Sequence, residues 1–173
     1  MYWIIKFLLT VCMLIICVIT DIKCKKIKNS VCALSIVLGI VLNLFEFGIK
    51  GILYSILGIT IPIVILYILF FIKSLGAGDI KLFATIGSIW GANIVFYSMI
   101  FSFLIGGFIG LLISVIKKIL LSGLNAFLKY IKICFITRSF PSYISSNNSK
   151  STFCFSPAIM LGTIIAIFYI GKY

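Results

Sequence analysis

The stretch Ser74-Leu75-Gly76-Ala77-Gly78-Asp79-Ile80-Lys81-Leu82 interrupts a long apolar run near the middle of the chain. About twenty apolar residues precede it, and a second apolar run begins directly after it. Its two glycines permit a tight turn or the close approach of another backbone. A carboxylate at or inside a membrane boundary is costly, so Asp79 is a candidate functional residue. The chain has only one other aspartate, Asp21, at the end of the first apolar run.

The composition is that of an integral membrane protein. Of the 173 residues, 63% are hydrophobic and only 10% are charged, and the mean hydropathy is +1.32. A net charge of +12 would also fit a nucleic-acid-binding protein, but the basic residues collect between the apolar runs, as in cytoplasmic loops of membrane proteins. We therefore predict a single membrane-embedded domain over residues 1–173, in contact with lipid and not with nucleic acid.

The residue types present limit the possible chemistry. The chain has no histidine and its six cysteines form no Cys-x-x-Cys pair, so we expect neither a zinc site nor a disulfide framework. The missing histidine also excludes Ser-His and Cys-His catalysis. Any catalysis would depend on carboxylates, a lone thiol, lysine or hydroxyl groups.

The apolar runs predict an all-α polytopic bundle of about six spans, because a helix needs about 20 residues to cross the hydrocarbon core. The predicted spans are Trp3–Thr20, Val31–Phe47, Ile52–Ile72, Ile80–Trp90, Ile94–Ile116 and Phe153–Ile170. The fourth is short, which favours a loop at Lys73–Asp79 that dips into the membrane, and a turn is predicted at Gly91–Asn93. From Lys117 to about Phe135, apolar and polar residues segregate on two helical faces, which predicts a cytoplasmic amphipathic helix on the membrane surface.

The basic residues orient the predicted spans. In a six-span topology the segments 21–30, 73–81 and 117–152 lie on one side of the membrane and hold twelve of the 15 Lys and Arg residues. That side is predicted to be cytoplasmic, with both termini outside. Asp21, at the end of the first span, and Asp79, at the start of the fourth, then meet the same cytoplasmic boundary.

Two aspartates at one level are compatible with several functions. A carboxylate pair can hydrolyse an amide when the ionised member takes a proton from water and the protonated member polarises the carbonyl. Neighbouring like charges and partial desolvation separate the two pKa values, so the pair titrates as a unit. In a purely structural interpretation, Asp21 ends one helix and Asp79 caps the next. A small transporter built around the carboxylates is a further alternative.

The segment Gly76-Ala77-Gly78-Asp79-Ile80-Lys81-Leu82 resembles the Gly-x-Gly-Asp motif of type IV prepilin peptidases, which are membrane-embedded aspartyl proteases. In that family another aspartate, followed by basic residues, stands at the cytoplasmic end of an earlier span, as Asp21 does here. Lys28 stands where a proline is usual, whereas Phe155-Ser156-Pro157-Ala158 is similar to the Phe-x-Pro opening of the last span. Presenilin-type proteases also use Gly-x-Gly-Asp but pair it with Tyr-Asp, and here Thr20 precedes the aspartate.

The resemblance implies an aspartic endopeptidase in which Asp21 and Asp79 are catalytic and no cofactor or metal takes part. Gly76 and Gly78 are expected to let the loop backbone pair with an extended substrate. The implied substrate is a pilin-like precursor whose basic leader is cut at the cytoplasmic face of the plasma membrane. The chain is similar to the short, peptidase-only forms of Flp/Tad-type and preflagellin systems, without the N-terminal zinc and methyltransferase region. A non-catalytic scaffold for pilus assembly remains an alternative.

Overall fold

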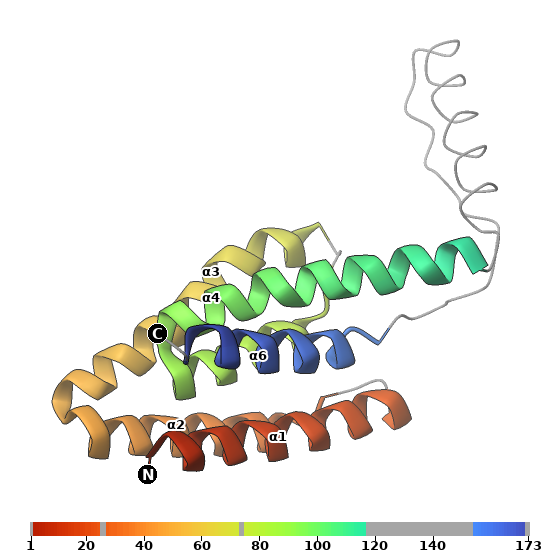
Figure 1. Cartoon of the computed structure of the whole chain (residues 1–173). Coiled ribbons are helices and arrows are strands. Elements are labelled where there is room, and N and C mark those ends of the chain that lie inside the picture. Colours follow the sequence, from red (N-terminus) through yellow and green to blue (C-terminus); the bar gives the residue numbers. More distant parts are fainter. Residues whose placement is uncertain (1, 25–26, 73–74, 117–153, 172–173) are drawn as a thin grey trace. The chain divides into compact units, whose positions relative to one another are not determined.

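The computed structural model describes residues 2–24, 27–72, 75–116 and 154–171, and the regular structure in these ranges is entirely helical. In chain order the helices are α1 (Tyr2–Cys24), α2 (Asn29–Phe47), α3 (Ile49–Phe71), α4 (Ala77–Ile116) and α6 (Ser156–Ile170) (Figure 1). The predicted all-α fold is confirmed. The described residues up to Gly106 and from Cys154 onward form one compact unit, and the end of α4 after Gly106 belongs to a second. The predicted amphipathic helix at 117–135 lies outside the described residues.

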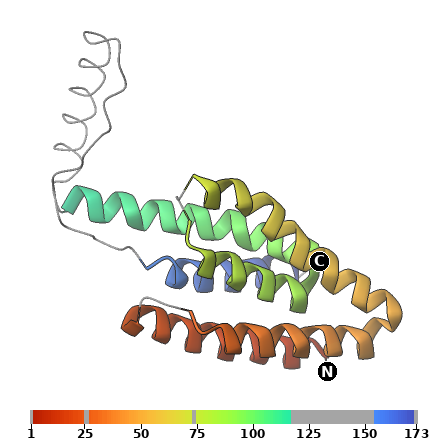
Figure 2. The same ribbon diagram turned by 180° about the vertical axis from the view of Figure 1, so that it is seen from behind.

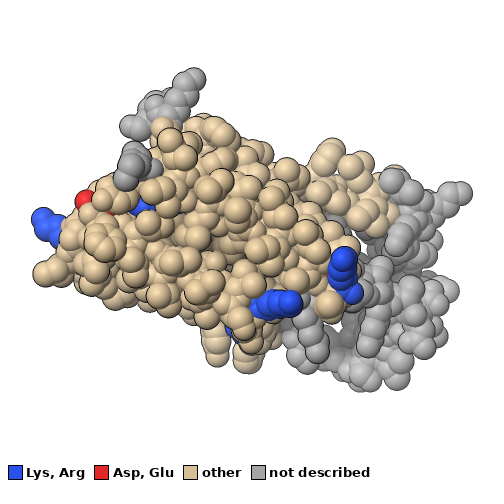
Figure 3. All heavy atoms as spheres, turned by 90° about the horizontal axis from the view of Figure 1, so that it is seen from below, with Lys and Arg blue, Asp and Glu red and all other residues tan. Residues whose placement is uncertain are grey.

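Four helices are long and apolar enough to cross a membrane, namely α1, α2, α3 and the part of α4 from Ala77 to Ile113. The helix α6 is also apolar but has only 15 residues. On the face seen in Figure 3, charged side chains lie towards the ends of the described helices, and the surface between them is uncharged. Such a surface suits the apolar interior of a bilayer. The count of six spans stays a prediction.

A glycine divides α4 into two segments. At Gly91 the backbone has φ 75° and ψ −174°, a conformation that glycine adopts without the steric penalty of a side chain. The segment before Gly91 and the segment after it, as far as Gly106, run in opposite directions (Figures 1 and 2). The turn predicted at Gly91–Asn93 is therefore a break at one residue, after which the helix resumes at once.

Several helix ends differ from the predicted boundaries, and two of these changes affect an aspartate. The loop predicted at Lys73–Asp79 is shorter, because α4 begins at Ala77 and Asp79 lies in its first turn. Negative side chains in a first turn are stabilised by the partial positive charge of the helix N-terminus. At the other site α1 continues to Cys24, so that Asp21 lies near the end of the helix and not after it.

Hydrogen bonds between polar side chains connect the helices inside the apolar core. Asn43 Nδ2 of α2 donates to Ser55 Oγ of α3 at 2.7 Å and to the Ser88 carbonyl of α4 at 2.8 Å. Trp90 Nε1 donates to Thr10 Oγ1 of α1 at 2.8 Å. Buried polar groups need such partners, because an unpaired one is costly away from water. These bonds tie the first segment of α4 to α1 and to α2, and they tie α2 to α3.

Two glycines bring the backbones of α3 and α4 into direct contact. A Cβ atom placed on Gly58 would lie 2.0 Å from the Gly87 carbonyl oxygen, and one placed on Gly87 would lie 1.9 Å from the Gly58 carbonyl oxygen. Only residues without a side chain permit this approach, which is typical of helix contacts in membranes. The contact sets the position of the first segment of α4 and hence of the turn that carries Asp79.

Candidate active site

The two aspartates line the same cavity, which has a volume of about 420 Å³. Its lining residues come from the end of α1, the start of α2 with the residue Ile27 before it, and the start of α4: Asp21, Ile27, Asn29, Gly76, Ala77, Gly78, Asp79 and Lys81. Both aspartates are half-buried. The structure thus brings together all four site residues that the sequence predicted, Asp21, Asp79, Gly76 and Gly78.

Asp79 is held by the backbone of its own helical turn. The Gly76 N–H donates to Asp79 Oδ2 at 3.3 Å, and the Asp79 N–H donates to the Gly76 carbonyl at 3.1 Å. The side-chain bond matches the half of a capping box in which the third helical residue reaches back to the capping residue. Asp79 therefore caps α4, as the structural interpretation predicted, but from the third helical position. Capping does not withdraw the side chain from the site, because the residue still lines the cavity.

Asp21 is held by a side chain from the far end of the chain. Ser156 Oγ, at the start of α6, donates to Asp21 Oδ2 at 2.5 Å, and Ser156 is completely buried. The Cys154 thiol lies 4.0 Å from the Asp21 carbonyl oxygen. Ser156 is not among the site residues that the sequence predicted. Its only signal was its place inside the Phe155-Ser156-Pro157 segment, where the middle position of the Phe-x-Pro pattern specifies no residue type.

Two further contacts join the start of α4 to the segment at the start of α2. Lys81 Nζ donates to Asn29 Oδ1 at 2.9 Å, which ties α4 to the first residue of α2. A Cβ atom on Gly78 would lie 2.9 Å from Ile27 Cδ1, so the glycine allows the isoleucine side chain to pack closely against the loop. At Gly76 an added Cβ would lie 3.3 Å from Asp79 Oδ2. Gly76 therefore gives space at Asp79 and Gly78 gives space at Ile27, whereas pairing of this segment with a peptide remains a prediction.

The cavity offers acid–base chemistry by carboxylates. Within the described ranges, no three side chains of the types His, Cys, Asp and Glu come together in a way that could hold a metal ion. Asp21 and Asp79 are the acidic groups of the cavity, and Lys81 is its basic group. A pair of half-buried carboxylates with an adjacent space is the arrangement needed to activate a water molecule against a carbonyl.

Comparison with known proteins adds one result. A family model described as the type IV leader peptidase family matches residues 8–111. The matched range contains both aspartates and the Gly76–Lys81 segment, and it ends before α6. No curated protein and no solved structure matches the chain. Because the family model covers more than half of the 173 residues, the chain belongs to the type IV leader peptidase family.

Proposed function

We propose that the protein is a membrane-embedded aspartic endopeptidase, with Asp21 and Asp79 as its catalytic pair. Membership of the leader peptidase family implies a peptidase. The observation that carries the assignment of the pair is the cavity that both aspartates line with Gly76, Ala77 and Gly78. The substrate is a pilin-like precursor, and its leader is removed at the cytoplasmic face of the plasma membrane.

In the proposed reaction the two carboxyl groups have complementary roles. The ionised group accepts a proton from water as the water oxygen attacks the scissile carbonyl carbon, and the protonated group donates to the carbonyl oxygen. Collapse of the tetrahedral intermediate breaks the C–N bond. The leaving amine takes the proton that the first carboxylate had accepted from water, and the second carboxylate regains a proton from the hydroxyl of the intermediate. The two groups titrate as a coupled pair, so the roles belong to the pair and not to one fixed residue.

The location of the pair suits a substrate that lies in the membrane. Asp21 is in the last turn of one apolar helix and Asp79 in the first turn of another, which supports a cavity close to the membrane boundary. A precursor whose hydrophobic helix lies in the bilayer would present the end of that helix at this level, and its scissile bond would be positioned by that insertion. Gly76, before α4, and Gly78, in its first turn, both line the cavity and have no side chain that would obstruct an extended peptide.

The direct test is leader cleavage of co-expressed pilin-like precursors in membranes. We expect Asp21→Asn and Asp79→Asn to abolish cleavage, because each removes one carboxyl group and preserves the side-chain shape. The matched control is Glu46→Gln, which alters the third acidic residue of the chain. Glu46 is paired with Lys6, which is only 4% exposed, and glutamine keeps an oxygen that accepts the lysine hydrogen bond.

The outcomes separate the hypotheses. Loss of cleavage in both aspartate variants, with retention in the Glu46→Gln control and equal membrane insertion, supports the catalytic pair. Cleavage at the wild-type level by either aspartate variant overturns the pair. Failure of the wild-type protein to cleave any precursor in the panel contradicts the proposed substrate class.

A further inference from the structure

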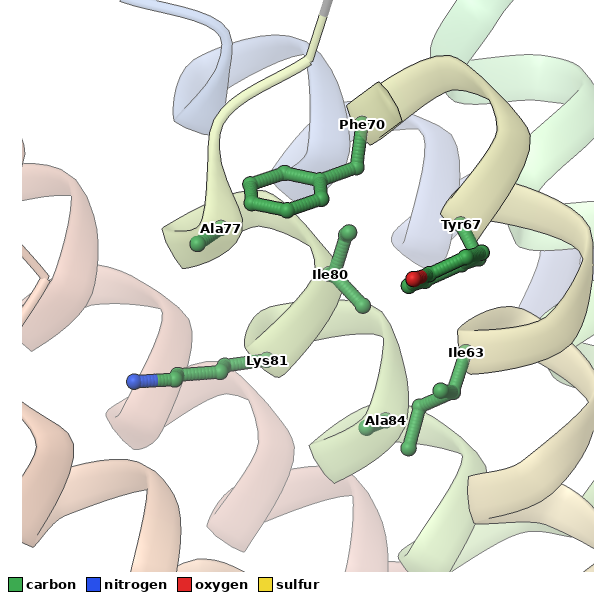
Figure 4. A pocket seen from close by; sticks show the side chains of 7 residues that line it. All are labelled: Ile63, Tyr67, Phe70, Ala77, Ile80, Lys81 and Ala84. Atoms are coloured by element: carbon green, nitrogen blue, oxygen red, sulfur yellow. The ribbon is translucent and has the colours of Figure 1, made fainter. Parts of the chain in front are cut away.

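A second cavity, of about 270 Å³, lies between the end of α3 and the start of α4. We call it the α3–α4 groove, and its lining residues are Ile63, Tyr67 and Phe70 of α3 and Ala77, Ile80, Lys81 and Ala84 of α4 (Figure 4). In Figure 4 the rings of Phe70 and Tyr67 lie on either side of Ile80, and the Lys81 ammonium points away from them. The interior of the groove therefore offers hydrocarbon and aromatic surface only.

The groove adjoins the cavity of the two aspartates. Ala77 and Lys81 line both spaces, and Ala77 is two residues from Asp79. From Ala77 the groove follows α4 for seven residues to Ala84, which corresponds to about 10 Å along the helix axis. Alanines at both of these positions leave room that larger side chains would fill. The Lys81 ammonium is bonded to Asn29 at the aspartate side and does not close the groove.

We propose that the α3–α4 groove is a substrate subsite that binds apolar side chains of the precursor's hydrophobic segment next to the scissile bond. This inference rests on the proposed function. A peptide held between Asp21 and Asp79 reaches the groove by passing Ala77, and about 10 Å accommodates three residues of an extended chain. The apolar lining binds bulky aliphatic or aromatic side chains and offers no partner to a charged one. An acyl chain of a lipid has the same apolar chemistry. Only a peptide, however, would place a scissile bond at the aspartates and apolar side chains in the groove at the same time.

A subsite at this place affects substrate binding more than the chemical step. Its contacts are made to side chains beside the scissile bond, and they are the same in the bound substrate and in the transition state. Removal of such uniform binding raises KM and leaves kcat unchanged. Even one missing methylene group in a hydrophobic pocket changes the discrimination between substrates by about 10-fold to 200-fold.

The first experiment asks what occupies the groove. Phe70, which lines it and is 42% exposed, is replaced by the photoreactive amino acid benzoylphenylalanine in membranes that contain pilin-like precursors. The matched control has the same replacement at Phe71, which is 79% exposed and does not line the groove. We expect crosslinks to the precursor or its product from position 70 and not from position 71. Equal crosslinking at both positions, or adducts with lipid alone, would overturn the inference.

The second experiment measures cleavage kinetics of Phe70→Ala and Phe71→Ala. We expect Phe70→Ala to raise KM about tenfold with kcat within about twofold of wild type, and Phe71→Ala to change neither. Identical KM values for the two variants would overturn the subsite while leaving the peptidase intact. Conversely, full activity of Asp21→Asn or Asp79→Asn would overturn the proposed catalytic pair. Crosslinks from position 70 would still identify the molecule that occupies the groove.

Discussion

Asp21 and Asp79 are held by contacts of different kinds, although both line one cavity. The carboxylate of Asp79 is bonded to the backbone of Gly76 within the same helical turn, so its position depends on local structure. The carboxylate of Asp21 is bonded to the Ser156 hydroxyl of α6, so its position depends on the packing of a helix that is distant in sequence. Changes at the start of α6 are therefore expected to reach the site through Asp21.

This difference gives a prediction for Ser156. A hydrogen bond to a charged group contributes about 1.5–3 kcal/mol, and misplacement of a catalytic group is costly in rate. We expect Ser156→Ala to lower kcat for leader cleavage about tenfold with little change in KM. Ser156→Thr keeps the hydroxyl and should restore most of kcat, which a purely structural role would not require. Wild-type kcat in Ser156→Ala would contradict a positioning role.

A second prediction concerns the contact between Gly78 and Ile27. An added Cβ at Gly78 would lie 2.9 Å from Ile27 Cδ1, and valine adds two further methyl groups. We expect Gly78→Val to reduce the cleavage rate at least tenfold by displacing the loop beside Asp79. Because the obstacle is a flexible side chain, the double variant Gly78→Val with Ile27→Ala should recover part of the rate. Full activity of a folded Gly78→Val protein would count against a role of this glycine in the site.

At the scale of the helix, the break at Gly91 determines the course of α4. Any other residue at this position would have to adopt a left-handed backbone conformation at φ 75°. Its Cβ would also lie 2.0 Å from Cζ of Tyr54. The Tyr54 hydroxyl donates to the Trp90 carbonyl at 2.8 Å, so displacement of the ring would also break this bond. Left-handed strain and overpacking each cost about 1–2 kcal/mol or more.

We therefore predict that Gly91→Ala lowers the free energy of unfolding by about 2 kcal/mol or more. Unfolding of the purified protein in detergent measures the change. Gly107→Ala is the matched control, because an added Cβ at Gly107 meets no described atom within 4 Å. Equal free energies of unfolding for the two variants would show that α4 tolerates a side chain at the break, and would contradict the prediction.

The sequence predicted the helices well and their contacts poorly. Apolar runs located α1, α2 and α3, and the small residues at Gly91–Asn93 located the break in α4. The backbone contact of Gly58 with Gly87 was missed, because a glycine within an apolar run does not reveal which helix approaches it. The helix ends near both aspartates were also misplaced, since polar residues in a first or last turn have the same composition as a loop.

At the scale of the molecule, charged side chains lie at both ends of the packed helices. The two aspartates lie where α1 ends and α4 begins, whereas the pair of Lys6 and Glu46 joins the start of α1 to the end of α2. The predicted topology places Asp21 and Asp79 at the same membrane boundary from the positions of lysines alone, and in the structure both residues line one cavity. The hydrogen bond from Ser156 could not be predicted, because it depends on how α6 packs against α1.

The cytoplasmic location of the active site is a prediction for the whole molecule. Lys23 and Lys50 are exposed and belong to opposite ends of the bundle in this topology. In a variant without native cysteines, we expect Lys50→Cys to react with a membrane-impermeant maleimide in intact cells. Lys23→Cys should react only after permeabilisation. The reverse labelling pattern would place the aspartates on the outer face.

The measurement that tests the central claim most directly is single-turnover cleavage by Asp21→Asn, Asp79→Asn and the double variant in reconstituted membranes. Catalytic groups that act as a unit show strongly non-additive losses. The account predicts that each single variant loses nearly all cleavage and that the double variant is no slower than either. Wild-type cleavage by one single variant, or independent losses that multiply in the double variant, would contradict a two-carboxylate mechanism.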